Sequence, residues 1–284
     1  VLKYGIPEFR LPNSVVDHEI NTLRELGVSF VKDMVIGKTL SHADLEDMGF
    51  KGIFVGSGAG LPRFMGIPGE NLIGVMSSNE YLTRVNLMGA GRTDAPTPVT
   101  LGHRAAIIGG GNTAMDSART ARRMGAEKVY VVYRRGEAEM PARIEEVAHA
   151  KEEGIEFLTL HNPLEYLGDE KGRVTTMRLQ RMELGEPDES GRRSPVPVPG
   201  AVSDVEVDMV IVSVGVSPNP LIPEAMAGLD ITRRGTIVVD EATMRTSLPD
   251  VYAGGDIVRG GATVILAMGD GRRAAAAMAE ALTC

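Results

Sequence analysis

A glycine-rich turn at residues 109–114, with the sequence Gly-Gly-Gly-Asn-Thr-Ala, is the part of the chain best suited to bind a charged ligand. It has the spacing G-x-G-x-x-A and lies between the apolar run 105–108 and a segment with helical periodicity. In such a turn the first glycine permits a tight bend, the second lets a pyrophosphate approach the backbone, and the last small residue lets helix and strand pack closely. N–H groups at the helix start then hold the phosphates. The motif predicts a dinucleotide site, and a turn without a ligand is the alternative.

Two arginines, Arg134 and Arg135, follow the next predicted strand, residues 129–133. An NAD site carries an acidic residue at this position, which binds the ribose 2′-hydroxyl. The nearest candidate, Glu127, comes before the strand rather than after it. Two guanidinium groups instead favour a 2′-phosphate, through charge-assisted and bidentate hydrogen bonds. We therefore predict NADP as the nucleotide, and a pair of solvated surface arginines is the alternative.

A second glycine cluster, Gly254-Gly255-Asp256, follows the predicted strand 251–253. A strand that ends in this way exposes the Asp256 carboxylate where the backbone is bare, which suits a ribose or polyol hydroxyl. The last helix begins near Thr263, and its N–H groups and positive dipole end could stabilise an anionic reduced flavin. A capped helix packed on a strand is the alternative.

No other set of residues has the spacing of a catalytic or metal site. The five histidines form no metal-ligand spacing with one another, and no G-x-S-x-G motif or Cys–His pair indicates covalent catalysis. Loop 56–60 is rich in glycine, but Pro62 prevents the helix that a dinucleotide fingerprint needs. We predict no catalytic side chain and no metal ligand.

The composition is that of a globular protein, and its 284 residues are enough for about two domains. The net charge of −8 argues against a nucleic-acid partner, since phosphate binding needs clustered Lys and Arg. No apolar run is long enough to cross a bilayer and no secretory signal opens these residues, so we expect a cytoplasmic protein without a membrane partner. The single cysteine, Cys284, cannot form an internal disulfide or a CxxC redox centre.

The elements around the first turn alternate between strand and helix, which is typical of βαβ units and a parallel sheet. The expected strands are 105–108, 129–133 and 155–160, and the helices between them are 113–124 and 142–153. The fold class is therefore α/β. Further helices are expected at 14–26, 78–88 and 263–282, and further strands at 28–31, 34–36, 52–55, 173–183, 205–214, 236–239 and 251–253. The Gly- and Pro-rich segments 89–98 and 215–220 are the expected domain boundaries, and 187–194 is an expected hairpin tip.

These motifs, in this order, resemble the small (beta) subunit of NADPH-dependent glutamate synthase and, equally, the large subunit of NADH-dependent ferredoxin:NADP oxidoreductase. The resemblance extends over the whole chain. It is carried by residues 3–12, 66–71, 109–116, 133–135 with 139–142, and 253–256 through 269–273.

The resemblance implies a complete Rossmann-like NADP domain at 98–215, inserted into an FAD-binding domain formed by 1–97 and 216–284. It implies an oxidoreductase in which a hydride passes between NADP(H) and FAD, and electrons then pass to iron–sulfur centres, a large partner subunit or a ferredoxin-type carrier. By the same resemblance, NADP is bound by Gly109, Gly111, Asn112, Thr113, Arg134 and Arg135, and the flavin is contacted by Gly255, Asp256 and Thr263. Gly110 and Gly215 are further expected cofactor-binding residues, and Gly215 lies at the second boundary.

Two features of the family are missing from this sequence, namely its cysteine-rich segment and its FAD fingerprint. The chain also opens on Val1 rather than Met, so we expect a piece of a longer protein whose FAD domain is incomplete. A non-catalytic NADP-binding module is the alternative function.

Overall fold

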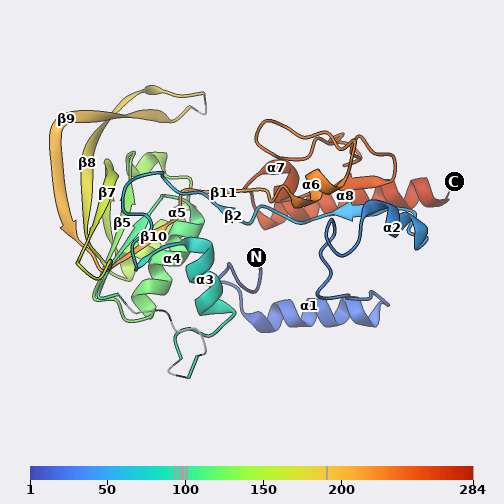
Figure 1. Cartoon of the computed structure of the whole chain (residues 1–284), viewed down its shortest axis with the longest axis horizontal. Helices are drawn as coiled ribbons and strands as arrows, with labels where there is room; N and C mark the ends of the chain where they lie inside the picture. The colour runs from blue at the N-terminus through green and yellow to red at the C-terminus, as the bar shows by residue number, and fades with distance from the viewer. Residues whose placement is uncertain (93, 96–98, 100–101, 190, 284) are drawn as a thin grey trace. The chain divides into compact units, whose positions relative to one another are not determined.

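The computed structural model describes residues 1–92, 94–95, 99, 102–189 and 191–283, which fold as two compact units (Figure 1). The first unit is formed by Val1–Leu26 and Pro62–Val214, and the second by Gly27–Leu61 and Gly215–Cys284. The expected boundary at 97/98 and the residue Cys284 lie outside the described residues. Both units combine helices with parallel strands, which confirms the α/β class.

The first unit is built on a five-stranded sheet in which every neighbouring pair is parallel. Strands expected at 105–108, 129–133 and 155–160 are present as β4, β5 and β6, and β3 is an addition that sequence periodicity did not indicate. The order is β3 (Val75–Ser77), β10 (Met209–Val212), β4 (Arg104–Ile108), β5 (Lys128–Tyr133) and β6 (Glu156–Thr159).

Helices pack on one face of this sheet and a second sheet packs on the other. Successive strand residues point to opposite faces, so Ala105 and Ile107 of β4 pack with the helices, and Ala106 and Ile108 pack with the second sheet. The helices are α3 (Ser78–Asn86), α4 (Asn112–Arg123) and α5 (Ile144–Glu152), and the second sheet is the antiparallel set β7 (His161–Gly168), β8 (Val174–Pro187) and β9 (Arg193–Glu206). The turns that follow β4 and β5 thus extend from a sheet that is covered on both faces.

Strand β9 begins earlier than the sequence predicted, since no strand was expected between the hairpin tip and residue 205, and it contains three prolines. Pro195, Pro197 and Pro199 alternate along it, and β9 lies at the end of the order β7-β8-β9. Proline has no N–H for a ladder bond and is tolerated at such an edge. The expected strand 205–214 is divided, because residues 205–206 end β9 and residues 209–212 form β10.

The second unit holds a short parallel pair, β1 (Ile53–Val55) with β12 (Val251–Ala253). Its core includes Val55, Val251, Ala253 and Ile257. The strands expected at 28–31, 34–36 and 236–239 are absent, and only isolated bridges such as Ile36–Leu40 occur there, because no neighbouring strand is available to pair. The helices are α2 (His42–Asp47), α6 (Leu221–Ala225), α7 (Asp256–Arg259) and α8 (Val264–Thr283).

The remaining elements are short or exposed. They are α1 (Asn13–Glu25), β2 (Leu61–Pro62), the 3-10 helix η1 (Glu137–Glu139) and β11 (Val216–Ser217).

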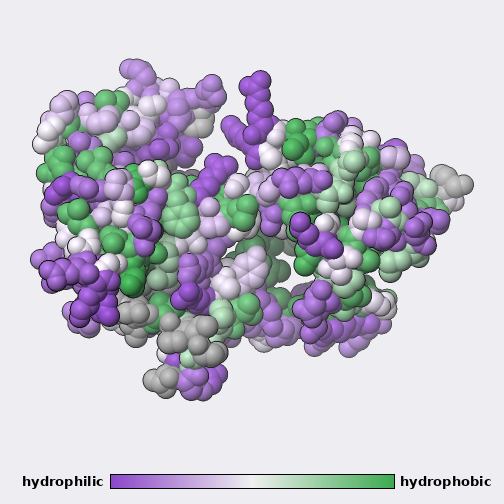
Figure 2. Space-filling model, in the orientation of Figure 1, coloured by the Kyte–Doolittle hydropathy of each residue, from purple (hydrophilic) through white to green (hydrophobic). Residues whose placement is uncertain are grey.

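Hydrophilic and hydrophobic side chains are interspersed over the visible surface (Figure 2). Among the described residues, no helix has both the length and the apolar character that crossing a bilayer requires.

Candidate functional site

The first two glycines of the 109–114 turn are required by the protein's own packing. Gly109 has φ +142°, and a Cβ atom on it would lie 2.2 Å from the carbonyl oxygen of Ser213. A Cβ atom on Gly110 would lie 2.7 Å from the ring of Tyr133. Only glycine can occupy these two positions without displacing a neighbour.

Gly111 is different, because no protein atom fills the place of its missing side chain. Its φ of −92° is open to any residue, and the nearest atom to a Cβ there would be Cγ of Pro141, at 4.0 Å. Internal packing therefore does not explain the glycine. The bare backbone at this point is accessible, which is the property that close approach of a pyrophosphate requires.

Helix α4 begins directly after this open position, and no side chain caps it. Gly111 is the N-cap residue, and the first amides that bond back to it are those of Ala114 and Met115, at 3.0 and 3.2 Å from its carbonyl oxygen. The Asn112 side chain does not cap the helix, because its Oδ1 accepts a hydrogen bond from the backbone N–H of Arg143 at 2.9 Å. The N–H groups of Asn112 and Thr113 are left at the positive end of the helix dipole, an arrangement that suits an anion.

The two arginines after β5 lie in unlike environments. Arg134 is exposed, and no hydrogen bond or ion pair joins it to another described residue. Arg135 is only 6% exposed and forms an ion pair with Asp188, at the tip between β8 and β9. Arg134 is therefore available to a ligand, whereas Arg135 is engaged by a carboxylate that sequence reasoning did not connect with it.

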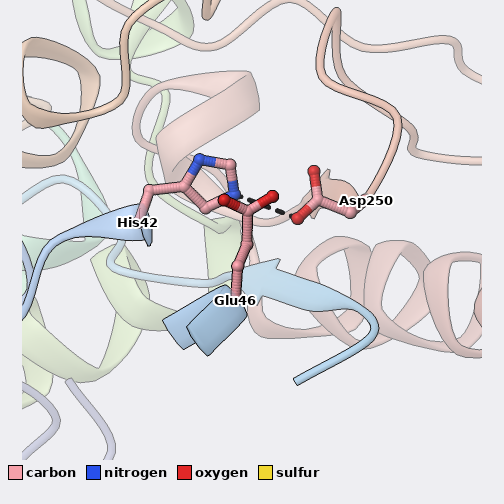
Figure 3. Close-up of side chains that lie close together, drawn as sticks. All are labelled: His42, Glu46 and Asp250. Atoms are coloured by element: carbon pink, nitrogen blue, oxygen red, sulfur yellow. Dashed lines mark hydrogen bonds and ion pairs between the residues drawn. The ribbon is translucent and has the colours of Figure 1, made fainter. Parts of the chain in front are cut away.

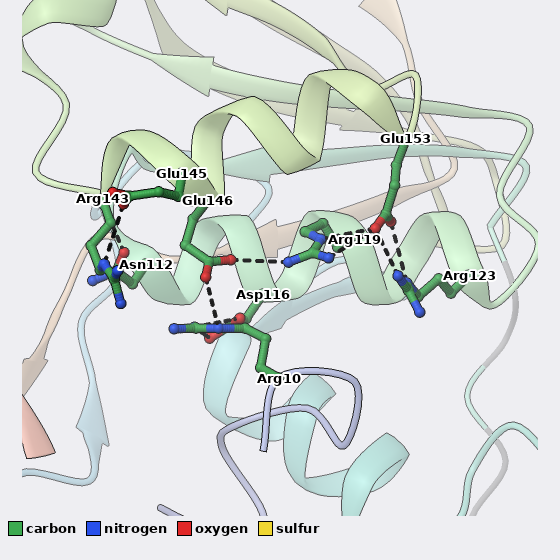
Figure 4. A network of polar contacts seen from close by, with 9 residues as sticks. All are labelled: Arg10, Asn112, Asp116, Arg119, Arg123, Arg143, Glu145, Glu146 and Glu153. Carbon is green, nitrogen blue, oxygen red and sulfur yellow. Dashed lines mark hydrogen bonds and ion pairs between the residues drawn. The ribbon is translucent and has the colours of Figure 1, made fainter. Parts of the chain in front are cut away.

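A buried network of charges ties the N-terminal segment to α4 and α5 (Figure 4). Arg10 Nη1 lies 2.8 Å from both carboxylate oxygens of Asp116, and Arg10 Nε lies 3.1 Å from Glu146. Glu146 also accepts a hydrogen bond from Arg119 at 3.0 Å. Burial raises the pKa of Asp116, while Arg10 acts in the opposite direction. The segment 3–12 thus fixes the helix whose N-terminus forms the candidate anion site.

The candidate residues of the second unit lie around the start of α7 and α8. Gly255 has φ +75°, and the Asp256 carboxylate accepts a hydrogen bond from the amide of Ala262 at 3.0 Å. Thr263 Oγ1 accepts from the amide of Leu266 at 3.4 Å, as a capping residue does. Gly215 has φ +109° and open space around the place of a Cβ atom. The structure therefore brings Gly255, Asp256 and Thr263 into one loop region.

Asp270 is a buried residue of this region that the sequence reasoning did not select. Its carboxylate accepts hydrogen bonds from the amide of Gly255 at 3.0 Å and from the guanidinium groups of Arg259 and Arg273. These bonds, chiefly that from Arg259, lower the pKa of Asp270 to about 2. The Gly-Asp-Gly-Arg-Arg sequence at 269–273 was the available signal.

A further set that was missed consists of His42, Glu46 and Asp250, whose potential ligand atoms lie within 4.8 Å of one another (Figure 3). The spacing of four residues between His42 and Glu46 was the available signal. The third residue could not be found from sequence, because it lies 208 positions beyond His42.

Comparisons with other sequences identify relatives among NADPH-linked enzymes. The chain is 38% identical to the NADP(+)-dependent formate dehydrogenase subunit beta of Moorella thermoacetica, over 99% of this chain and 39% of that one. It is 38% identical to a putative glutamate synthase [NADPH] small chain of Cereibacter sphaeroides, over 99% of this chain and 68% of that one. The corresponding small chain of Halomonas elongata is 37% identical, over 96% and 58%. The resemblance to glutamate synthase small chains is confirmed, and the chain spans between 39% and 68% of the length of these relatives.

Two solved structures share the fold. FprA from Mycobacterium tuberculosis in complex with NADPH has a TM-score of 0.77 at 20% identity, over 99% of this chain and 75% of that one. Thioredoxin reductase from T. acidophilum has a TM-score of 0.59 at 24% identity, over 82% and 66%. The profile of the pyridine nucleotide-disulphide oxidoreductase family matches residues 12–281. The chain therefore belongs to the pyridine nucleotide-disulphide oxidoreductase family.

Proposed function

We propose that the first unit binds NADP(H) on the turn between β4 and α4, and that the chain is the nucleotide-binding part of a flavin-linked oxidoreductase of the glutamate synthase small-chain type. Gly109, Gly110, Gly111, Asn112 and Thr113 form the pyrophosphate site. When bound, NADP(H) supplies hydride transfer, and the protein binds and orients it. This role needs no catalytic acid or base from the chain.

The observation that carries the proposal is the unfilled space at Gly111. Gly109 and Gly110 are explained by contacts with Ser213 and Tyr133, but the nearest atom to the place of a Cβ on Gly111 is Cγ of Pro141, at 4.0 Å. A glycine that packing does not need, directly before an uncapped helix, fits a close backbone approach by a phosphate group. Relatives whose names include NADPH or NADP(+) support the same nucleotide.

Selection of NADP(H) over NAD(H) is assigned to Arg134. It follows β5, where a ribose 2′-substituent lies in this class of site, and its guanidinium is exposed. Arg135 is retained as a second candidate, but it would have to exchange Asp188 for a phosphate. Of the two arginines, Arg134 thus has no charged partner among the described residues, whereas Arg135 is already paired with a carboxylate.

FAD is proposed for the second unit, where the residues fit only part of the cofactor. Gly215, Gly255, Asp256 and Thr263 offer bare backbone, a carboxylate and a helix start. Two strands of this unit are followed by glycines among its described residues, β1 by loop 56–60 and β12 by Gly254 and Gly255. Neither turn has the G-x-G-x-x-G/A spacing of a dinucleotide fingerprint. A partner subunit or a ferredoxin-type carrier is the proposed electron acceptor.

A non-catalytic NADP-binding module is the second candidate function, and the incomplete flavin site favours it. Fluorescence or calorimetric titration with NADPH and NADH tests what the two functions share. We expect saturable binding of both, at least about tenfold tighter for NADPH, since one charge-assisted bond to a phosphate contributes about 1.5–3 kcal/mol. Equal affinities would refute NADP selectivity, and an absence of binding would refute the nucleotide site. Oxidation of NADPH with ferricyanide, measured with and without added FAD, separates the two functions.

A further inference from the structure

Three side chains of the second unit, outside the proposed cofactor sites, converge on one point (Figure 3). His42 Nε2 lies 3.0 Å from Asp250 Oδ2, and one oxygen of Glu46 completes a set of potential ligand atoms within 4.8 Å of one another. The His42 and Asp250 side chains are 19% and 24% exposed, whereas Glu46 is exposed. The point where they meet is therefore half-buried and open on one side.

The elements that carry these residues are fixed by bonds of their own. His42 and Glu46 are four residues apart on α2, so they lie on the same side of the helix. The start of α2 is held by a capping box between Ser41 and Asp44. Asp250 is held by its carbonyl oxygen, which accepts a hydrogen bond from the amide of Ile53 at 2.8 Å. The ligand atoms are thus brought together by ordered backbone.

The Glu46 carboxylate has no partner that would explain its position. No hydrogen bond or ion pair joins it to another described residue, although it points toward His42 and Asp250 (Figure 3). Two carboxylates so close to each other repel unless a cation lies between them. A divalent cation bound between them would balance both carboxylates.

We propose that His42, Glu46 and Asp250 bind one Zn²⁺-type divalent transition-metal ion. An imidazole nitrogen with carboxylate oxygens suits Zn²⁺ and its neighbours, whereas Mg²⁺ and Ca²⁺ prefer oxygen ligands alone. Zn–N and Zn–O distances of about 2.0–2.2 Å place two ligand atoms of a tetrahedral ion about 3.4 Å apart. The His42–Asp250 separation of 3.0 Å is close to this value, and rotation of the flexible Glu46 side chain supplies the third ligand.

The ion would join α2 to the strand pair β1–β12, because Asp250 directly precedes β12. Its effect would be to stabilise the second unit, since an ion that binds only the folded state favours that state. Water would complete the coordination on the exposed side. The site is independent of the proposed nucleotide site, because its three ligands all belong to the second unit.

Calorimetric titration of the EDTA-treated and dialysed chain with ZnCl₂ near neutral pH tests this proposal. We expect one ion per chain, a higher thermal midpoint with Zn²⁺, and with CoCl₂ the intense visible absorption of four-coordinate Co²⁺. His42→Gln should weaken Zn²⁺ binding at least about 100-fold and Glu46→Gln at least about tenfold, since even outer-shell partners of metal sites contribute 10–100-fold. Glu46→Gln is the decisive variant, because its carboxylate supports no described contact and the fold should survive.

The matched control is His149→Gln on α5. Glu145 and His149 have the same spacing of four residues and are both exposed, but they belong to no set of three potential ligands among the described residues. This variant should bind Zn²⁺ as the unaltered chain does. The proposal is overturned if the unaltered chain binds no Zn²⁺ at micromolar concentration, if Glu46→Gln binds it unchanged, or if His149→Gln loses as much affinity as His42→Gln.

Discussion

Arg10 Nη1 lies 2.8 Å from each of the two carboxylate oxygens of Asp116, which is buried in the second turn of α4. The pair joins residues 106 positions apart in the sequence. The candidate anion site lies at the first turn of the same helix. The N-terminal segment therefore contacts the helix that forms the proposed nucleotide site.

The first prediction is that Arg10→Met destabilises the first unit. The substitution leaves Asp116 buried beside Glu146 without its cation, and breaking one partner of a buried pair costs about 3–5 kcal/mol. Urea unfolding should show a loss near the lower end of that range, because Arg10 is 20% exposed. Lys3→Met is the control, since it removes an exposed ion pair with Asp17 and should cost less than about 1 kcal/mol. Equal effects of the two substitutions would contradict the assignment.

A second prediction concerns nucleotide binding at Gly111. Gly111→Val should leave the fold intact, because the nearest atom to the place of the new Cβ is Cγ of Pro141, at 4.0 Å. It should weaken NADPH binding at least about 100-fold, or about 3 kcal/mol, because the side chain would occupy the place of the pyrophosphate. Gly109→Ala is the contrasting variant and should destabilise the fold, since its Cβ would lie 2.2 Å from the Ser213 oxygen. A folded Gly111→Val chain with unchanged affinity would show that the turn binds no phosphate.

Substitutions of the two arginines after β5 should have different effects, one on nucleotide preference and the other on stability. Arg134→Ala should remove most of the preference for NADPH over NADH, about 1.5–3 kcal/mol, with little change in stability. Arg135→Ala should instead lower stability, because it removes a nearly buried guanidinium group together with its ion pair to Asp188. The measurements are the ratio of the two dissociation constants and the midpoint of urea unfolding. If Arg135→Ala alone abolished the preference, Arg135 would be the phosphate ligand.

Acid should weaken the second unit through Asp270. Its pKa is about 2 in the folded chain, below the usual value of 3.8, so its contribution is complete above about pH 4 and is lost as the pH falls toward 2. The contribution amounts to about 2 kcal/mol. Asp270→Asn should therefore lower stability near neutral pH and flatten the fall between pH 4 and 2. Asp47→Asn, which removes an exposed carboxylate of the same unit, serves as the control in urea unfolding at each pH.

The fifth prediction is that this chain purifies with little flavin. The second unit lacks a glycine fingerprint among its described residues, and losing about 4 kcal/mol of phosphate contacts weakens binding roughly a thousandfold. The visible absorbance of the purified chain measures its flavin content directly. A stoichiometrically yellow chain that oxidises NADPH would refute this prediction and would favour the oxidoreductase over the binding module.

Local patterns in the sequence were sufficient to predict those elements whose formation depends on residues close together in the chain. The 109–114 turn, the parallel strands beside it and the helices on their face follow from spacing and hydrophobic periodicity. Contacts between distant residues could not be predicted in this way. Asp188 lies 53 positions beyond Arg135, and Asp250, which precedes β12, lies 208 positions beyond His42. Short apolar runs such as 28–31 were wrongly expected to be strands, since a strand also needs a neighbour.

The prolines of β9 also bear on how the chain behaves at high concentration. Pro195 and Pro197 pair with Leu184 and Met182 of β8 and are two residues apart, so their nitrogen atoms face the same side of the strand, the side turned away from β8. At these two positions the outer edge has no N–H to donate to an incoming strand. An unprotected edge of this length would be a template for aggregation. The prolines therefore protect the longest strand edge of the first unit against self-association.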